Sequence, residues 1–188
     1  MIAGSARGRQ LKGPPVRYRE GVRPSSDLVR GALFDSLVAM GADFTRVLDL
    51  YAGTGALGIE ALSRGADSCD FVEKDRGMAA VIRDNLAATG FSGQANVLPV
   101  TAELAMERLS GQYTLVLADP PYADDSAISN LEKMTESGLI DQESGTIALE
   151  HSTRTEPPAG IGGFELRRSL RHGDSSVSIY GPDSRGGD

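Results

Sequence analysis

The sequence predicts an α/β fold with a doubly wound, mostly parallel sheet. From residue 46 onward, short and mostly unbroken apolar runs alternate with segments of helical periodicity. Such runs are typical of strands buried on both faces of a parallel sheet, and the alternation is typical of helices that cross from one strand to the next. Near the C-terminus, apolar and polar residues alternate on both sides of a glycine, which predicts an antiparallel hairpin at the sheet edge.

These elements can be assigned to residue ranges. We expect strands at residues 47–50, 69–72, 95–99, 115–118 and 146–150, and helices at residues 57–63, 76–89, 102–109 and 126–135. The C-terminal hairpin should pair residues 164–170 with residues 176–180 around Gly173.

The N-terminal residues differ in composition from the rest. Residues 1–24 are rich in Gly, Pro and Arg, with short apolar stretches on either side of Arg7-Gly8. This pattern predicts a small β-hairpin outside the core, followed by an extended, proline-containing linker.

A helix should follow this linker. Apolar residues recur at helical spacing from Leu28 to Val38, Ser25 or Ser26 suits the N-cap, and Gly41 suits the C-terminal end. We therefore expect a basic N-terminal hairpin or arm with its linker at residues 1–24, one domain at residues 25–181, and a frayed tail at residues 182–188.

The composition is that of a globular protein. Apolar residues make up 40% and charged residues 24% of 188 residues, which suits one domain. No apolar run approaches the roughly 20 residues of a membrane helix, and no signal-peptide pattern is present. The one cysteine, Cys69, lies in an apolar run and is expected to be a buried thiol. We therefore expect a cytoplasmic protein that does not associate with membranes.

The net charge of −7 is unevenly distributed. Residues 1–30 contain seven basic and two acidic side chains, a net charge of +5, whereas the remainder carries −12. An acidic body with a basic arm is typical of an enzyme that acts on a nucleic acid. The alternative is a solvated basic tail without a partner.

A glycine-rich loop follows the first predicted strand. Gly53, Gly55 and Gly58 have the spacing G-x-G-x-x-G, and Glu73 lies at the end of the second strand. Glycines let the backbone approach a ligand, and a carboxylate in this place can accept ribose hydroxyl groups, so the pattern fits both NAD and S-adenosylmethionine. Asp49, four residues before Gly53, favours S-adenosylmethionine. A carboxylate there repels a pyrophosphate and suits the ammonium of a methionine moiety.

The fourth predicted strand runs into Asp119-Pro120-Pro121-Tyr122. Two prolines fix two φ angles, so the loop is rigid, and it should lie beside the glycine loop. Tyr122 offers a face on which a base can stack. The Asp119 carboxylate and the Pro120 carbonyl can accept the hydrogens of an exocyclic amine and orient its lone pair. We predict that Asp119, Pro120 and Tyr122 are the catalytic residues of an enzyme that methylates a nucleic-acid base, without a metal.

Several short motifs extend over nearly the whole chain. They are Ile2-Ala3-Gly4 with Arg7-Gly8-Arg9, Arg23-Pro24-Ser25-Ser26-Asp27, residues 49–55, Val72-Glu73-Lys74, Asp119-Pro120-Pro121-Tyr122, and Gly173 ahead of Tyr180. With these motifs the chain resembles the RsmD family of 16S rRNA (guanine(966)-N2)-methyltransferases. That family belongs to the Asp-Pro-Pro-Tyr class of Rossmann-like methyltransferases that use S-adenosylmethionine.

The resemblance implies a class I, Rossmann-like fold and methylation of the exocyclic N2 of one guanine in 16S ribosomal RNA. The substrate would be a partly assembled small ribosomal subunit in the bacterial cytoplasm, and we expect the enzyme to be a monomer. The expected contacts to S-adenosylmethionine are Asp49, Tyr51, Gly53, Gly55, Gly58, Glu73, Lys74 and Ala102, the last near the adenine. The expected contacts to RNA are Arg7, Arg9, Lys12 and Arg23.

Three other functions fit part of the pattern. The first is the same chemistry on adenine N6 or cytosine N4, or on a protein glutamine; the protein enzymes usually carry Asn where Asp119 stands. The second is an NAD-binding oxidoreductase, which Asp49 disfavours. The third is a non-catalytic RNA-binding or assembly factor, which the intact Asp119 and Tyr122 disfavour.

Overall fold

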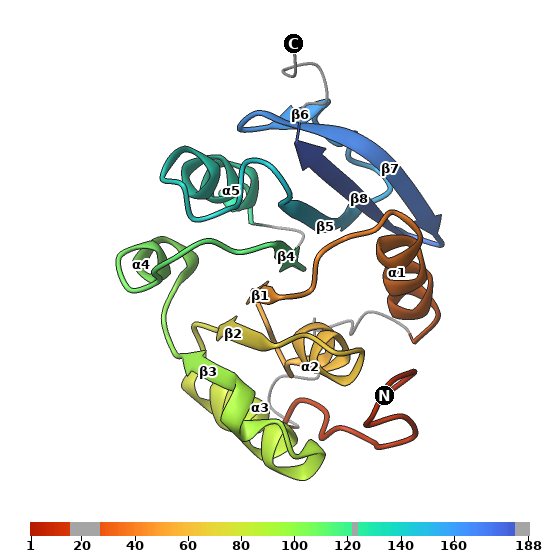
Figure 1. The fold of residues 1–188 in the computed structure, drawn as a ribbon, viewed down its shortest axis with the longest axis vertical. Helices are drawn as coiled ribbons and strands as arrows, with labels where there is room; N and C mark the ends of the chain where they lie inside the picture. The colour runs from red at the N-terminus through yellow and green to blue at the C-terminus, as the bar shows by residue number, and fades with distance from the viewer. Residues whose placement is uncertain (16–26, 122–123, 183–188) are drawn as a thin grey trace.

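The computed structural model describes residues 1–15, 27–121 and 124–182, and contains one eight-stranded sheet in the order β3-β2-β1-β4-β5-β8-β7-β6 (Figure 1). The strands are β1 Arg46–Leu50, β2 Ser68–Val72, β3 Ala95–Leu98, β4 Leu115–Ala118, β5 Thr146–Ser152, β6 Gly160–Ile161, β7 Phe164–His172 and β8 Ser175–Pro182. The helices are α1 Asp27–Ala39, α2 Ala56–Ser63, α3 Arg76–Thr89, α4 Ala102–Met106 and α5 Ala127–Glu136, with a 3₁₀ turn at Ser92–Gln94. Strands β1 to β5 are parallel, and β6, β7 and β8 are antiparallel to their neighbours.

Helices cover both faces of the parallel part of the sheet, as the unbroken apolar runs predict. Side chains alternate between the faces along each strand, so Val47 packs into one hydrophobic cluster and Leu48 into the other. Helices α1, α2 and α3 contribute to the first cluster, and α4 and α5 to the second. Figure 1 shows α1 and α2 on the opposite side of the sheet from α4 and α5. The predicted doubly wound fold is confirmed.

The C-terminal hairpin is also confirmed, with two additions. Strands β7 and β8 pair around Gly173, and β8 lies antiparallel to β5. The edge of the sheet is formed by the two-residue β6, which is too short to give a sequence pattern. Pro182 still belongs to β8 and not to a frayed tail, and residues 183–188 lie outside the described residues.

The predicted N-terminal β-hairpin is wrong. Among residues 1–15 no strand forms, and the chain makes successive turns instead. Two side chains of α2 bind the backbone here: the Glu60 carboxylate accepts hydrogen bonds from the N–H groups of Ile2 and Ala3, and the Ser63 hydroxyl accepts one from Ala6. These groups satisfy N–H donors that a hairpin would have paired with its other strand.

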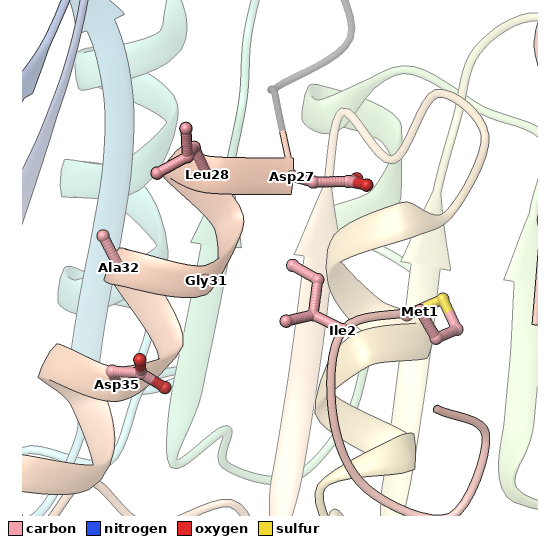
Figure 2. A pocket seen from close by; sticks show the side chains of 7 residues that line it. All are labelled: Met1, Ile2, Asp27, Leu28, Gly31, Ala32 and Asp35. Carbon is pink, nitrogen blue, oxygen red and sulfur yellow. The ribbon is translucent and has the colours of Figure 1, made fainter. Parts of the chain in front are cut away.

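The N-terminal arm, defined here as residues 1–15, is also part of the core and not outside it. Ala6 is only 1% exposed and belongs to the cluster beneath α1 and α2. Figure 2 shows Ile2 directed towards α1 at the border of an open hollow of about 610 Å³. Gly31 of α1 borders the same hollow, and none of the candidate site residues lines it.

Helix α1 confirms the predicted helix, although not all of its apolar residues are buried. Leu33 and Leu37 pack into the core, whereas Leu28 and Val38 are exposed. The predicted caps, Ser25 and Ser26, lie outside the described residues.

Candidate active site

The carboxyl ends of β1, β2 and β4 meet at one edge of the sheet. In the register of the parallel strands, Leu50 pairs with both Val72 and Ala118. The next residue along each strand is Tyr51, Glu73 or Asp119. The structure therefore brings together three segments that are distant in sequence, at the edge where open α/β sheets bind ligands.

Asp49 lies beneath this edge and is 1% exposed. Its Oδ2 accepts a hydrogen bond from the Gly58 N–H at 2.8 Å. Helix α2 begins after Gly55, which has no side chain with which to cap it, and Gly58 is the third helical residue. Asp49 therefore provides from β1 the acceptor that an N-cap side chain normally provides, and its charge suits the positive end of the helix dipole.

The pKa of Asp49 is raised well above its usual value, mainly because burial removes the carboxylate from water. The Gly58 hydrogen bond opposes this shift, whereas the negative charges of Asp119 and Glu73 add to it. Glu73 and Asp119 thus both act on Asp49, and we call these three carboxylates the acidic triad. Such an arrangement favours a positively charged ligand.

The glycine loop has the left-handed backbone that its sequence permits. Gly53 and Gly55 have φ angles of 56° and 79°, and Tyr51 has a φ of 65° although it is not a glycine. Gly58 is required for a different reason. A Cβ there would lie 2.7 Å from the Cys69 sulfur and still closer to the Phe71 ring, so only glycine lets α2 pack this close to β2.

Glu73 is held at the end of β2 by two backbone donors. Its Oε2 accepts from Gly53 N–H at 2.9 Å and its Oε1 from Asp75 N–H at 2.8 Å. Each carboxylate oxygen retains a second lone pair that can accept a hydroxyl hydrogen. Partial burial raises the pKa of Glu73, and the two hydrogen bonds oppose that rise. The neighbouring Lys74 is exposed.

The segment after β4 is described only in part. Asp119 is half-buried, Pro120 is buried and Pro121 is exposed, while Tyr122 lies outside the described residues. The Asp124 N–H donates to the Pro121 carbonyl at 2.8 Å.

A polar network that sequence reasoning missed lies beside this loop. Asn130 of α5, 1% exposed, donates from Nδ2 to the Tyr51 hydroxyl at 3.1 Å and to the Glu103 Oε1 at 3.0 Å. The Asn130 hydrogen bond is the main reason why the pKa of Glu103 falls to about 2. In the sequence, Asn130 is visible only as one amide beside the apolar Leu131 and Met134 of a predicted helix. This pattern does not identify the partner of the amide.

Of the remaining predicted residues, those that the structure describes lie on α4 and within residues 1–15. Ala102 is buried at the start of α4, which Thr101 caps. Of the predicted RNA contacts, Arg7 is exposed, the Arg9 guanidinium donates to the Ala88 carbonyl, and Lys12 Nζ lies 2.8 Å from an Asp84 carboxylate oxygen. Arg23 lies outside the described residues.

Two further properties concern only the part of the chain that the structure describes. No group of three or more His, Cys, Asp or Glu side chains there has the arrangement of a metal site. No helix there has the length and hydrophobicity that a membrane crossing requires.

The chain matches the family described as Conserved hypothetical protein 95 over residues 1–181. It belongs to this family. Putative rRNA methyltransferase YlbH of Bacillus subtilis is 33% identical over 183 residues, which are 96% of this chain and 97% of that protein. Ribosomal RNA small subunit methyltransferase D of Escherichia coli is 31% identical over 186 residues, 99% of this chain and 91% of that protein.

A solved structure of a similar protein has the same fold. The putative methyltransferase yhhF from Escherichia coli superposes with a TM-score of 0.81 at 30% identity, over 98% of each chain. The family member described here therefore has the fold of class I methyltransferases, as the resemblance to the RsmD family implies.

Proposed function

We propose that this chain is an S-adenosylmethionine-dependent methyltransferase that methylates the exocyclic N2 of a guanine in 16S ribosomal RNA, at the site equivalent to guanine(966). The observation that carries the proposal is the acidic triad at the carboxyl edge of β1, β2 and β4, directly beside the glycine loop. Three carboxylates repel the pyrophosphate of NAD, whereas they attract a cofactor that carries a sulfonium and an ammonium.

The residues of this edge fit such a cofactor. A Cβ on Gly53 would meet nothing within 4 Å, so there is open space beside the loop. Glu73 has lone pairs for two ribose hydroxyl groups, and Asp49 would supply negative charge from below the loop when a cation is bound. Ala102 would contact the adenine from the start of α4, and Tyr51 would border the methionine moiety. Lys74 would lie at the outer rim, since it is exposed.

The catalytic loop would act by positioning the amine. Bound S-adenosylmethionine supplies a methyl group on a positively charged sulfur. Asp119 and the Pro120 carbonyl would accept the two amine hydrogens, which directs the nitrogen lone pair towards that methyl group, and Tyr122 would stack on the base. Asp119 would also accept the proton that the amine nitrogen loses on methylation, or pass it to water.

The RNA substrate is supported by the names of the relatives and by the charge of the N-terminal arm. YlbH and methyltransferase D are both named for ribosomal RNA. We assign the catalytic unit to residues 25–181 and the RNA contacts to Arg7, Arg9, Lys12 and Arg23 of residues 1–24. Phosphate contacts from these side chains would offset the cost of unstacking the guanine and would make binding sensitive to salt.

Replacing Asp119 tests the mechanism. Asp119→Ala should lower methyl transfer at least about 100-fold, because one of the two acceptors that orient the amine is lost. The substrate should be small subunits from a strain that lacks the modification, with labelled cofactor and mapping of the methylated nucleotide. Asp125→Asn is the matched control, because Asp125 is an exposed carboxylate near the same loop. Full activity of Asp119→Ala would refute the mechanism, and a label on another nucleotide would refute the assigned guanine.

A further inference from the structure

Asn85 of α3 connects the N-terminal arm to the glycine loop. Its Oδ1 accepts a hydrogen bond from the Lys12 N–H at 2.7 Å, and its Nδ2 donates to the Lys12 carbonyl at 3.2 Å. The same Nδ2 donates to the carbonyl of Thr54 at 3.0 Å. Thr54 lies between Gly53 and Gly55, so one side chain binds both the arm and the loop.

The amide group of Asn85 satisfies three backbone groups at once: the N–H and the carbonyl of Lys12, and the carbonyl of Thr54. A side-chain amide has two N–H hydrogens and a carbonyl oxygen, and all of them are used here. Aspartate would lack both donors and would place a charge beside two carbonyl oxygens. Asn85 is 1% exposed, so water cannot replace a lost bond without a rearrangement.

The rest of the arm is bound to the helix that begins at the same loop. Glu60 and Ser63 of α2 accept backbone hydrogen bonds from Ile2, Ala3 and Ala6. The position of the arm and the position of the glycine loop are therefore both determined by α2 and Asn85. A change in one should be transmitted to the other.

The charged part of Lys12 points away from this contact. Its side chain is 67% exposed and its ammonium lies 2.8 Å from the carboxylate of Asp84 on the outer surface of α3. The backbone of Lys12 thus binds Asn85, while its charge stays accessible to a phosphate. Lys12 can therefore contact RNA through its ammonium while its backbone binds Asn85, the residue that also binds the glycine loop.

We propose that Asn85 is a positioning residue that couples the docking of the N-terminal arm to the geometry of the glycine loop. RNA bound to the arm and cofactor bound to the loop then strengthen each other's binding, and by linkage the factor is the same in both directions. The inference rests on the proposed function, since it takes RNA and S-adenosylmethionine as the ligands.

The test measures the affinity for S-adenosylhomocysteine by calorimetry, with and without 16S ribosomal RNA from a strain that lacks the modification. For the unmodified chain, RNA should increase the affinity about fivefold or more, in the range typical of coupled sites. Asn85→Asp should lower the affinity without RNA several-fold and reduce the increase with RNA to a factor near one.

A second pair of variants leaves α3 and the loop unchanged. Lys12→Ala removes the exposed charge but keeps the backbone bonds to Asn85, whereas Lys12→Pro also removes the N–H donor. Lys12→Ala should bind RNA more weakly with the coupling factor retained, and Lys12→Pro should lose the factor. This pair decides the question if the buried Asn85→Asp substitution prevents folding.

The outcomes separate this inference from the proposed function. If the unmodified chain binds both ligands with a coupling factor of one, or if Asn85→Asp and Lys12→Pro retain the full factor, the coupling is refuted and the proposed function stands. If the unmodified chain binds no S-adenosylhomocysteine, the proposed function fails and this inference fails with it.

Discussion

Two aspartates on neighbouring strands differ in what surrounds them. Asp70 on β2 pairs in register with Leu48, the residue before Asp49 on β1. Asp70 accepts a hydrogen bond from the Tyr113 hydroxyl at 2.5 Å, and the Arg46 guanidinium lies 3.6 Å from its Oδ2. Arg46 also stacks over the Tyr113 ring, 4.7 Å from its centre. The charge of Asp70 is therefore balanced by its neighbours.

The charged groups around Asp49 have the same sign as its own carboxylate. The charged groups that influence it most are two other carboxylates, Glu73 and Asp119, and its hydrogen-bond donor is the backbone of Gly58. A buried charge without a cation is costly to the folded protein. A residue held at such a cost suggests a ligand that supplies the cation, whereas a balanced charge such as Asp70 indicates a structural role.

Asp49→Asn should have the larger effect on cofactor affinity of the two aspartate substitutions. The substitution keeps an acceptor for the Gly58 N–H but removes the negative charge. We expect the affinity for S-adenosylmethionine to fall about 30- to 100-fold, near 2 to 3 kcal/mol, as for loss of a charged hydrogen-bonding partner. The thermal stability of the ligand-free protein should stay equal or rise, because a buried charge is removed. Calorimetric titration and thermal unfolding measure both quantities.

Asp70→Asn is the matched control. It should lower the unfolding temperature, because Arg46 loses its opposite charge, and it should leave the cofactor affinity within about twofold. Equal losses of cofactor affinity in both variants would show that the two aspartates do not differ in role.

Gly58→Ala tests the donor side of the same contact. A methyl group there would press on Cys69 and Phe71 and move α2 away from β2, so we expect a loss of about 1 to 2 kcal/mol of stability. Because the Gly58 N–H would move with the helix, the pKa of Asp49 should rise further.

The control for Gly58→Ala is Gly31→Ala in α1. A Cβ at Gly31 would lie no closer than 3.9 Å to Ile2, which is ordinary contact. Alanine favours a helix over glycine by about 1 kcal/mol, so this variant should be as stable as the unmodified chain or more stable. Urea unfolding of both variants gives the comparison, and similar losses in the two would contradict the packing argument.

Local patterns were sufficient for the part of the site that the strands determine. Glu73 and Asp119 follow strands whose carboxyl ends share one edge, so their proximity follows from the parallel order alone. Asn130 and Asn85 were missed because each acts across elements that lie far apart in sequence. Nothing within α5 or α3 indicates which backbone or hydroxyl group the amide will meet.

The N-terminal hairpin was predicted wrongly for a related reason. The turn at Arg7-Gly8 is compatible with a hairpin when only local residues are considered. Glu60 and Ser63, more than fifty residues away, bind the backbone groups and decide the outcome. The hydrogen bond from Gly58 to Asp49 was not predicted, because it depends on the packing of α2 against β1.

The pH dependence of stability should give the smallest effect, and it can be measured without any ligand. The pKa values of Asp49 and Glu73 are raised in the folded protein, so each binds a proton more readily there than in the unfolded chain. Their contribution to stability is fully present below the ordinary carboxyl pKa, near 4, and is lost as the pH rises through the raised value. Glu103, with a pKa lowered to about 2, acts in the opposite sense: its contribution to stability is fully present above the ordinary carboxyl pKa and is lost as the pH falls through the lowered value.

The two effects therefore occupy different pH ranges, and the range above about pH 4.5 reports on Asp49 and Glu73. The unfolding temperature of the ligand-free protein should decline with pH there, and the decline should be shallower in Asp49→Asn. Saturating S-adenosylmethionine should stabilise the protein more as the pH rises through the same range, because a cation favours the ionised carboxylates. A decline of equal slope in Asp49→Asn would mean that folding does not raise the pKa of Asp49.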